Sequence, residues 1–389
     1  MTYDSAALSK PSEAERDRRY KAIREKMAEE GLSALVIIGG RNFVEGGNVI
    51  YFMGVALPAS LVIPLEGEPT LILDIYMSGH NWALTHGWVE KIAPGAKNGP
   101  KAMVEALKEG GAAEGKVGFV TDERFFRGEL EMDATLLAYL KEELPKVEPV
   151  RATHLVLGLR RYKSAEEVKL IERASEIADL ACEEMLRVAR PGVTENELYS
   201  RMQSVMAMHG WASSYLIIET GPTVFQSWAI PSHRTLGKGD VIVNEIMCIY
   251  AGYFSHPHKP ASIGKPRQEF RDMYAVVRAS YDAGAAMIGP GVRLGDLQKV
   301  MLAPIEEAGL LSGHPLIHAG GVTVIEDPIL LWYQNPNLEE TLEPGMLIYV
   351  QPQVVTKDDK LGIHVGDTFI ITDTGARKLN QFSPDFHEI

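Results

Sequence analysis

The residues best suited to chemistry in this sequence are histidines. Their unperturbed pKa lies nearest neutrality, so several facing one cavity could transfer protons or hold an anion. Such a pocket shifts toward positive charge and favours an anionic or neutral small molecule, for example a carboxylate. Five of the chain's eleven histidines lie in segments that contain sequence motifs: His256, His258, His314, His318 and His364.

Two of these histidines stand two positions apart in the run Ser255-His256-Pro257-His258-Lys259-Pro260. On a continuing strand, His256 and His258 would share one face. The intervening Pro257 instead favours an edge strand, a bulge or a strand end. Both remain candidates for catalysis, whereas we interpret His314 and His233 as loop residues outside the site.

The first part of the chain alternates a helical pattern with short apolar strands, which predicts an α/β domain over residues 1–155. The helix is expected over Glu13 to Glu30. The predicted strands are Ser33 to Ile38, Val49 to Met53, Ser60 to Pro64, Pro69 to Asp74 and Lys116 to Thr121.

A long helix opens the second part, which we place at residues 156–389. Ser164 with Glu167 three residues later predicts a capping box, and Pro191-Gly192 predicts the helix end. Pro191-Gly192-Val193 with Leu198 is matched at the same offsets by Pro290-Gly291-Val292 with Leu297, which indicates an internal duplication. Chance is the alternative, because Pro-Gly is a common helix end.

Strand pairs accompany these repeats and predict an α+β domain with antiparallel sheets. Asp240 to Cys248 is expected to pair with a return strand near Tyr253. Met346 to Val355 is expected to pair, past a polar turn, with Gly362 to Thr372.

Composition limits the classes of partner. The formal charge of −13 repels nucleic acid and anionic lipid, and the apolar runs are far shorter than a membrane span. The polar N-terminus has no apolar signal-peptide core, and Cys182 and Cys248 are the only cysteines. We therefore expect a cytoplasmic protein with no nucleic-acid or membrane partner.

Several stretches resemble the pita-bread family of methionine aminopeptidase, aminopeptidase P and creatinase, in that family's order and spacing. The N-terminal α/β domain suits the aminopeptidase P and creatinase branch. The stretches are Leu159-Arg160 through Lys163-Ser164-Ala165-Glu166-Glu167, Gly239-Asp240 with Gly252-Tyr253, Glu326-Asp327-Pro328, Glu343-Pro344-Gly345-Met346 and Gly366-Asp367-Thr368.

In the peptidases of this family, two aspartates, a histidine and two glutamates hold a pair of divalent metal ions. The resemblance places these ligands at Glu245, His256, His318, Gln351 and Gly366, so the histidine alone is unchanged. Two hard ions need anionic oxygen ligands, and one carboxylate remains. The sequence therefore predicts no pair of metal ions and no metal cofactor.

Creatinase is the family's precedent for hydrolysis without metal. Its catalytic histidine falls on Trp228 here, and its guanidinium-binding glutamates fall on His258 and Gln351. The negative charges that hold a cation are absent, so creatine is not the expected substrate.

The resulting hypothesis is a metal-independent, creatinase-like enzyme acting on a small non-peptide, carboxylate-bearing molecule. Hydrolysis of a C–N bond is the default, and a lyase or decarboxylase step is the alternative. The proposed catalytic residues are His318, His256, His258 and Glu245, and the proposed substrate-binding residues are Trp228, Gln351 and His364.

Two further hypotheses stay open. Glu245, His256 and His318 could hold a single zinc or iron ion. The domain could instead be a non-catalytic binding module, as in a histone chaperone subunit.

The resemblance also implies a homodimer, because these relatives place the N-terminal domain of one subunit near the active site of the other. Arg41, Asn42 and Phe43 are our candidates for that contact.

Overall fold

The computed structural model describes residues 10–39, 47–74, 76–95, 98–121, 134–210, 214–225, 230–333 and 337–389. The chain divides into two compact units, Met1–Arg160 and Arg161–Ile389. The domain boundary expected between residues 155 and 156 falls inside the last helix of the first unit. No helix in the described ranges is both long and apolar enough to cross a membrane.

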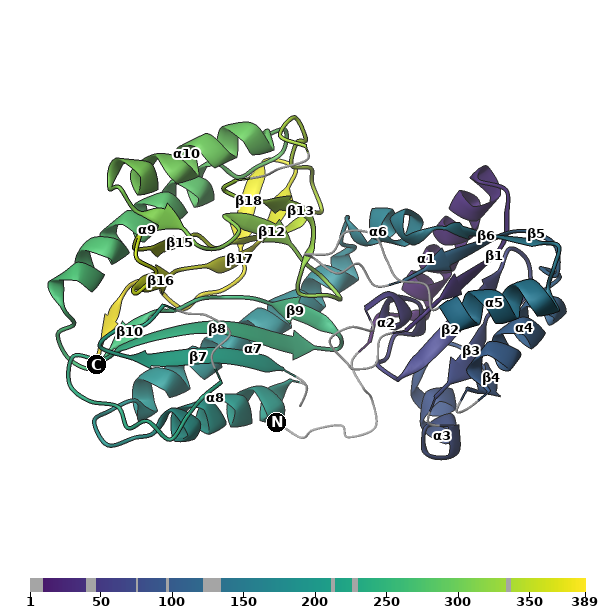
Figure 1. The fold of residues 1–389 in the computed structure, drawn as a ribbon, viewed down its shortest axis with the longest axis horizontal. Coiled ribbons are helices and arrows are strands. Elements are labelled where there is room, and N and C mark those ends of the chain that lie inside the picture. Colours follow the sequence, from purple (N-terminus) through teal and green to yellow (C-terminus); the bar gives the residue numbers. More distant parts are fainter. Residues whose placement is uncertain are drawn as a thin grey trace. The chain divides into compact units, whose positions relative to one another are not determined.

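The first unit is built on a six-stranded mixed sheet in the order β4-β3-β2-β1-β5-β6 (Figure 1). Its central strands are mostly buried, and Ala34 and Val36 of β1 share one apolar cluster with Met103 and Leu107 of helix α4. The strands are β1 (Leu32–Ile37), β2 (Ala59–Pro64), β3 (Thr70–Leu73), β4 (Lys91–Pro94), β5 (Gly115–Val120) and β6 (Val147–Arg151). The helices are α1 (Glu13–Glu29), α2 (Gly47–Met53), α3 (Tyr76–His86), α4 (Gly99–Glu109), α5 (Ala134–Glu143) and α6 (Thr153–Arg160).

One strand prediction in this unit is wrong. Val49 to Met53 forms most of helix α2, and the Gly54 amide donates to the carbonyl of Ile50 as in a helix. Every residue of α2 is buried, so its sequence shows no apolar face. A short apolar run of this kind fits a buried helix as well as a buried strand.

The second unit carries four helices and thirteen strands within its described residues. The helices are α7 (Ala165–Val188), α8 (Glu195–His209), α9 (Gln268–Met287) and α10 (Leu294–Glu307). The strands are β7 (Tyr215–Gly221), β8 (Val241–Tyr250), β9 (Tyr253–Ser255), β10 (Ala261–Ser262), β11 (Leu311–Ser312), β12 (Ile317–Ala319), β13 (Glu326–Leu330), β14 (Leu347–Val350), β15 (Gln353–Val355), β16 (Gly362–His364), β17 (Asp367–Thr372), β18 (Gly375–Lys378) and β19 (His387–Glu388).

The internal duplication is confirmed in the backbone of this unit. In each half a long helix ends, the chain turns at a glycine with positive φ (Gly192 or Gly291), and a shorter helix begins. The Gly192 amide donates to the carbonyl of Leu236, and the Gly291 amide donates in the same way to that of Leu342. The two Pro-Gly turns therefore start equivalent helices, α8 and α10.

The helices of the second unit lie on opposite sides of its sheets (Figure 1). Helices α7 and α8 pack on β7 and β8 through residues such as Met185, Met202 and Ile246. Helices α9 and α10 pack on β12, β14 and β17. The capping box at Ser164 and Glu167 forms as predicted and starts α7.

Two long predicted strands are each broken in the middle. The strand expected from Met346 to Val355 divides into β14 and β15, and that expected from Gly362 to Thr372 divides into β16 and β17. Strand β14 pairs with β17 in one sheet, whereas β15 pairs with β16 in another. Polar side chains cluster where these strands change sheets.

Candidate active site

Six polar residues of the second unit come together at these breaks. Glu245 lies on β8, and His256 and His258 follow β9 directly. His318 lies on β12, while Gln351 follows β14 and His364 ends β16. All except Glu245 are at most 1% exposed.

Short distances join the histidines into one cluster. His256 Nε2 lies 2.8 Å from Oε1 of Glu245. The ring centroid of His256 lies 4.7 Å from that of His258 and 5.4 Å from that of His318, and the rings of His258 and His364 are 3.8 Å apart. Five of the expected site residues therefore do share one buried location.

His258 occupies the space that a side chain at position 366 would need. The two residues exchange both backbone hydrogen bonds, at 3.0 Å each. A Cβ atom on Gly366 would lie 2.7 Å from Nδ1 of His258 and 3.0 Å from both Cβ of Gln351 and the carbonyl oxygen of Val350. Glycine at 366 and histidine at 258 thus fit one another sterically.

Gly366→Ala should lower the free energy of unfolding by about 1–3 kcal/mol, because the added methyl overpacks a rigid site. Gly375→Ala is the matched control, since a Cβ atom there has no heavy atom within 4 Å among the described residues. Urea unfolding of both variants measures the difference. When His258→Ala is already present, Gly366→Ala should lower the free energy of unfolding by less. An equal loss in both backgrounds would contradict the steric fit between His258 and Gly366.

Backbone carbonyls fix the tautomers of two histidines. Nδ1 of His318 donates to the carbonyl of Ala319 at 2.7 Å, and Nε2 of His364 donates to the carbonyl of Gln351 at 2.7 Å. The remaining ring nitrogens then carry lone pairs. A metal-binding histidine is typically held in this way, with its other nitrogen bonded to a carbonyl or carboxylate.

Several buried polar atoms of the cluster have no hydrogen-bond partner among the described residues. A native interior rarely leaves such groups unpaired, and each unpaired group costs about 1–3 kcal/mol. The atoms are Nδ1 of His256, both ring nitrogens of His258, Nε2 of His318, Nδ1 of His364 and Oε1 of Gln351.

Burial disfavours the charged form of His258, His318 and His364. It lowers the pKa of His258 and His364 well below the usual value, and neighbouring imidazoles add to the effect. Burial and then His256 lower the pKa of His318 to about 3. For Glu245, burial acts to raise the pKa, but the hydrogen bond from His256 and charge attraction outweigh it and lower the pKa to about 2. The rings of His258, His318 and His364 therefore favour the neutral form, and the expected shift of the pocket toward positive charge stays a prediction.

A buried polar network holds the histidine segment against β17. The ammonium of Lys259 lies 2.5 Å from Oδ1 of Asp367, and Tyr281 donates to Oδ2 at 2.7 Å. The backbone amide of His256 donates to Oγ1 of Thr368 at 3.2 Å. These contacts fix the backbone on either side of His258.

The structure also shows a site residue that the sequence did not select. The ring of His314 lies 4.8 Å from that of His364, and its Nδ1 lies 3.1 Å from Nε2 of Gln351. The close sequence spacing of His314 and His318 was the available signal. His233 is exposed, in agreement with its interpretation as a loop residue. Trp228, Arg41, Asn42 and Phe43 lie outside the described residues.

The cluster does not fit a pair of hard metal ions, but its donor atoms fit one metal ion. Glu245 is the single carboxylate at the five positions that the family resemblance assigns, and Gly366 offers no side chain. Ligand atoms of Glu245, His256 and His258 all lie within 4.8 Å of one another. His318, the third ligand in the alternative hypothesis of a single zinc or iron ion, is not in this group.

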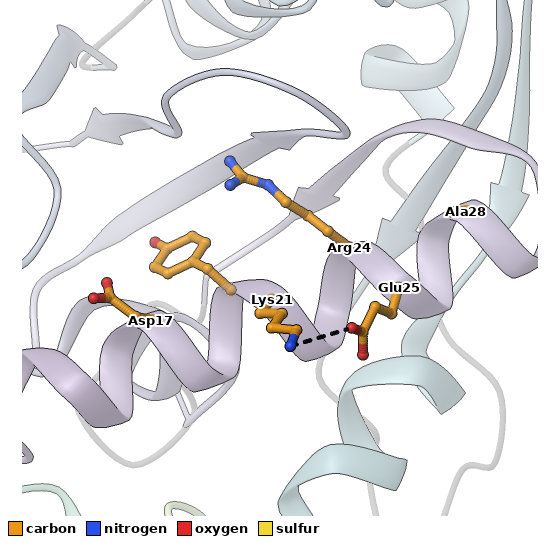
Figure 2. Close-up of a pocket in the computed structure, with 6 residues that line it drawn as sticks. Asp17, Lys21, Arg24, Glu25 and Ala28 are labelled. Carbon is orange, nitrogen blue, oxygen red and sulfur yellow. Dashed lines mark ion pairs between the residues drawn. The ribbon is translucent and has the colours of Figure 1, made fainter.

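A separate surface hollow lies along α1 in the first unit (Figure 2). Its labelled side chains belong to an exposed helix face, on which Lys21 and Glu25 pair at 3.9 Å. Such solvated pairs stabilise a helix weakly and indicate no chemistry. The residues that line the hollow are Asp17, Tyr20, Lys21, Arg24, Glu25 and Ala28.

Comparison with known families matches both units. The model of metallopeptidase family M24 matches residues 169–373, and the model of the creatinase/prolidase N-terminal domain matches residues 19–162.

Individual proteins agree with these matches. The chain is 28% identical over 236 residues to a protein named uncharacterized peptidase YqhT from Bacillus subtilis. The match covers 60% of this chain and 65% of that relative, so it spans just under two thirds of the relative's length. It is 26% identical over 252 residues to the Xaa-Pro dipeptidase of Pyrococcus furiosus, covering 64% of this chain and 71% of the relative. The structure of an Xaa-Pro dipeptidase from Bacillus anthracis superposes with a TM-score of 0.81 at 21% identity, covering 96% of this chain and 100% of that one. The expected fold is confirmed.

The same matches overturn the expected chemistry. A metal-independent enzyme for a non-peptide substrate is wrong, because the matched family is one of metallopeptidases and these relatives are named as peptidases. The expectation of no cofactor is wrong for the same reason, and lyase chemistry has no support. The loss of carboxylates does not exclude a metal site, because imidazole nitrogens are metal ligands too.

Proposed function

Because this chain belongs to metallopeptidase family M24, we propose that it is a metal-dependent hydrolase that cleaves the C–N amide bond of a short peptide. One observation carries the proposal. Glu245, His256 and His318 fall at the family's metal-binding positions, and the ligand atoms of Glu245, His256 and His258 lie within 4.8 Å of one another. Chemistry rather than packing explains why so many unpartnered donor atoms are gathered there.

Each residue has a proposed task. Glu245, His256 and His258 would hold a metal ion, which when bound polarises a carbonyl and lowers the pKa of water. His318 presents a bare Nε2 to the cluster and can accept a hydrogen bond from substrate or water. Gln351 and His364, linked by the hydrogen bond from Nε2 of His364 to the carbonyl of Gln351, would contact the substrate.

The substrate class follows from the relatives and from the charge of the site. Peptides with proline in the second position are the first class to test, because the relative from Pyrococcus furiosus is named an Xaa-Pro dipeptidase. Neutral imidazoles provide no fixed positive charge for a substrate carboxylate, so we expect the peptide ends to be recognised outside the histidine cluster.

The test is an assay of the purified protein against Xaa-Pro dipeptides, other dipeptides and Xaa-Pro tripeptides. We expect cleavage of at least one peptide class, loss of activity on chelation and recovery on adding a divalent metal ion. Glu245→Gln should lose the activity, whereas Glu183→Gln, which changes an exposed acid of the same unit, should keep it. Activity that survives in Glu245→Gln would come from a contaminant or from another site, and no cleavage by the metal-loaded protein would refute the proposal.

We further propose a homodimer in the cytoplasm. Two free, buried cysteines, Cys182 and Cys248, suit a reducing compartment. Light scattering at micromolar concentration should give twice the chain mass, and a monomer would contradict the dimer.

A further inference from the structure

The histidine cluster differs in donor chemistry from the carboxylate set implied by the family resemblance. At its centre the imidazole of His258 is fully buried, with neither ring nitrogen hydrogen-bonded to a described residue. Its ring lies between those of His256, at 4.7 Å, and His364, at 3.8 Å. An imidazole in this setting leaves one lone pair and one N–H unsatisfied unless something else binds it.

Three residues of the cluster form a metal-ligand set of two histidines and one carboxylate. Glu245, His256 and His258 supply one carboxylate and two imidazoles, and their ligand atoms lie within 4.8 Å of one another. Imidazole suits zinc, copper, iron and nickel, whereas carboxylates and water suit magnesium, calcium and manganese. The low exposure of His256 and His258 removes the competing water that a surface site would have.

We propose that this cluster binds one divalent transition metal ion through Glu245, His256 and His258, and that it has no second metal position. The inference rests on the metal dependence in the proposed function and adds the number and type of the ion. It replaces the set that included His318, because the structure brings His258 and not His318 within reach of the other two ligands.

The residues around the second metal position leave neither the ligands nor the space for a second ion. The side chain of Gln351 is neutral, and Gly366 contributes no ligand atom. The imidazole of His258 itself occupies the volume next to Gly366, since a Cβ atom there would meet Nδ1 at 2.7 Å. The change from a carboxylate to glycine at 366 therefore removes a ligand of a metal pair and makes room for a ligand of a single ion.

The experiment starts with the full-length protein, freed of metal by chelation and dialysis. Calorimetric titration with Zn²⁺ and with Mn²⁺ should give one site per chain, with Zn²⁺ bound at least about 100-fold more tightly than Mn²⁺. Co²⁺ should give visible d–d absorption bands at one equivalent and no further bands at a second equivalent. This spectrum is a readout that does not depend on activity.

His258→Ala should weaken Zn²⁺ binding by more than about 100-fold. Mutating a residue that is only hydrogen-bonded to a metal ligand already lowers metal affinity about 10- to 100-fold, and a ligand itself should matter more. His233→Ala, which removes an exposed imidazole of the same unit, is the control and should bind as the parent does. If His258→Ala does not fold, Glu245→Gln serves as the second ligand variant, and the stoichiometry of the parent still decides the number of ions.

Three results would overturn the inference: two ions per chain, no binding of Zn²⁺, or unchanged affinity in the folded ligand variants. These failures are separable from those of the proposed function. A protein with two ions that cleaves peptides would refute the single-ion site alone, whereas a protein with one ion that cleaves none would refute the peptidase proposal alone.

Discussion

Lys259→Met should lower the free energy of unfolding by about 3–5 kcal/mol, because it removes one partner of a buried ion pair and strands the other. Lys259 and Asp367 both have fully buried side chains, and their charged atoms lie 2.5 Å apart. Methionine has a similar shape, so the loss would come from the carboxylate of Asp367, which loses its buried counter-charge. Its remaining partners are Tyr281 and Lys378, whose ammonium lies 3.5 Å away.

Two matched variants separate charge from packing. Lys299→Met removes an exposed ammonium whose partner Asp296 is 3.7 Å away, and it should leave unfolding by urea unchanged. The double variant Lys259→Met with Asp367→Asn should recover part of the stability, because an amide is cheaper to bury than an unpaired carboxylate. A Lys259→Met protein as stable as the parent would mean that the pair does not hold the segment that carries His258.

Much of the fold could be predicted from local sequence signals. The capping box of α7, the paired Pro-Gly turns and the strand–turn–strand patterns each depend on a few adjacent residues, so they can be recognised without a structure. Helix α2 was mistaken for a strand because all of its residues are buried and no periodicity remains to be seen. The breaks after Val350 and before Asp367 were also missed, because which sheet a strand joins depends on partners far along the chain.

The sequence grouped residues that the structure brings together, but the metal-independent chemistry predicted for them was wrong. Family spacing placed Glu245, His256, His318 and Gln351 correctly in one region, and all four are buried or nearly so around it. His258 fills the space that a side chain at position 366 would need, and these two residues are far apart in the sequence. From motif spacing alone, one can see only that a glutamate is missing at position 366. The expected positive charge took no account of burial, which lowers the pKa of His258 and His318 and is a property of the fold.

His318→Ala should lower kcat/KM for the cleaved peptide by about 100- to 10,000-fold, the usual range for a residue that handles a proton or hydrogen bond in the transition state. The imidazole is 1% exposed, and Nδ1 is committed to the carbonyl of Ala319. Nε2 is left without a partner among the described residues, beside the ring of His256 at 5.4 Å. Because burial lowers its pKa to about 3, the side chain is neutral at pH 7 and acts through a lone pair.

The competing interpretation is a histidine that only supports the core. Its replacement by alanine would then leave a cavity against Tyr349, whose ring centroid lies 5.1 Å away, and cost about 1–3 kcal/mol of stability. Activity per folded molecule would stay unchanged. Melting temperature, Zn²⁺ affinity and kcat/KM measured on the same variant distinguish the two roles, because a working site residue loses rate while the protein keeps its metal and its fold. A destabilised variant with full activity would place the catalytic centre elsewhere in the second unit.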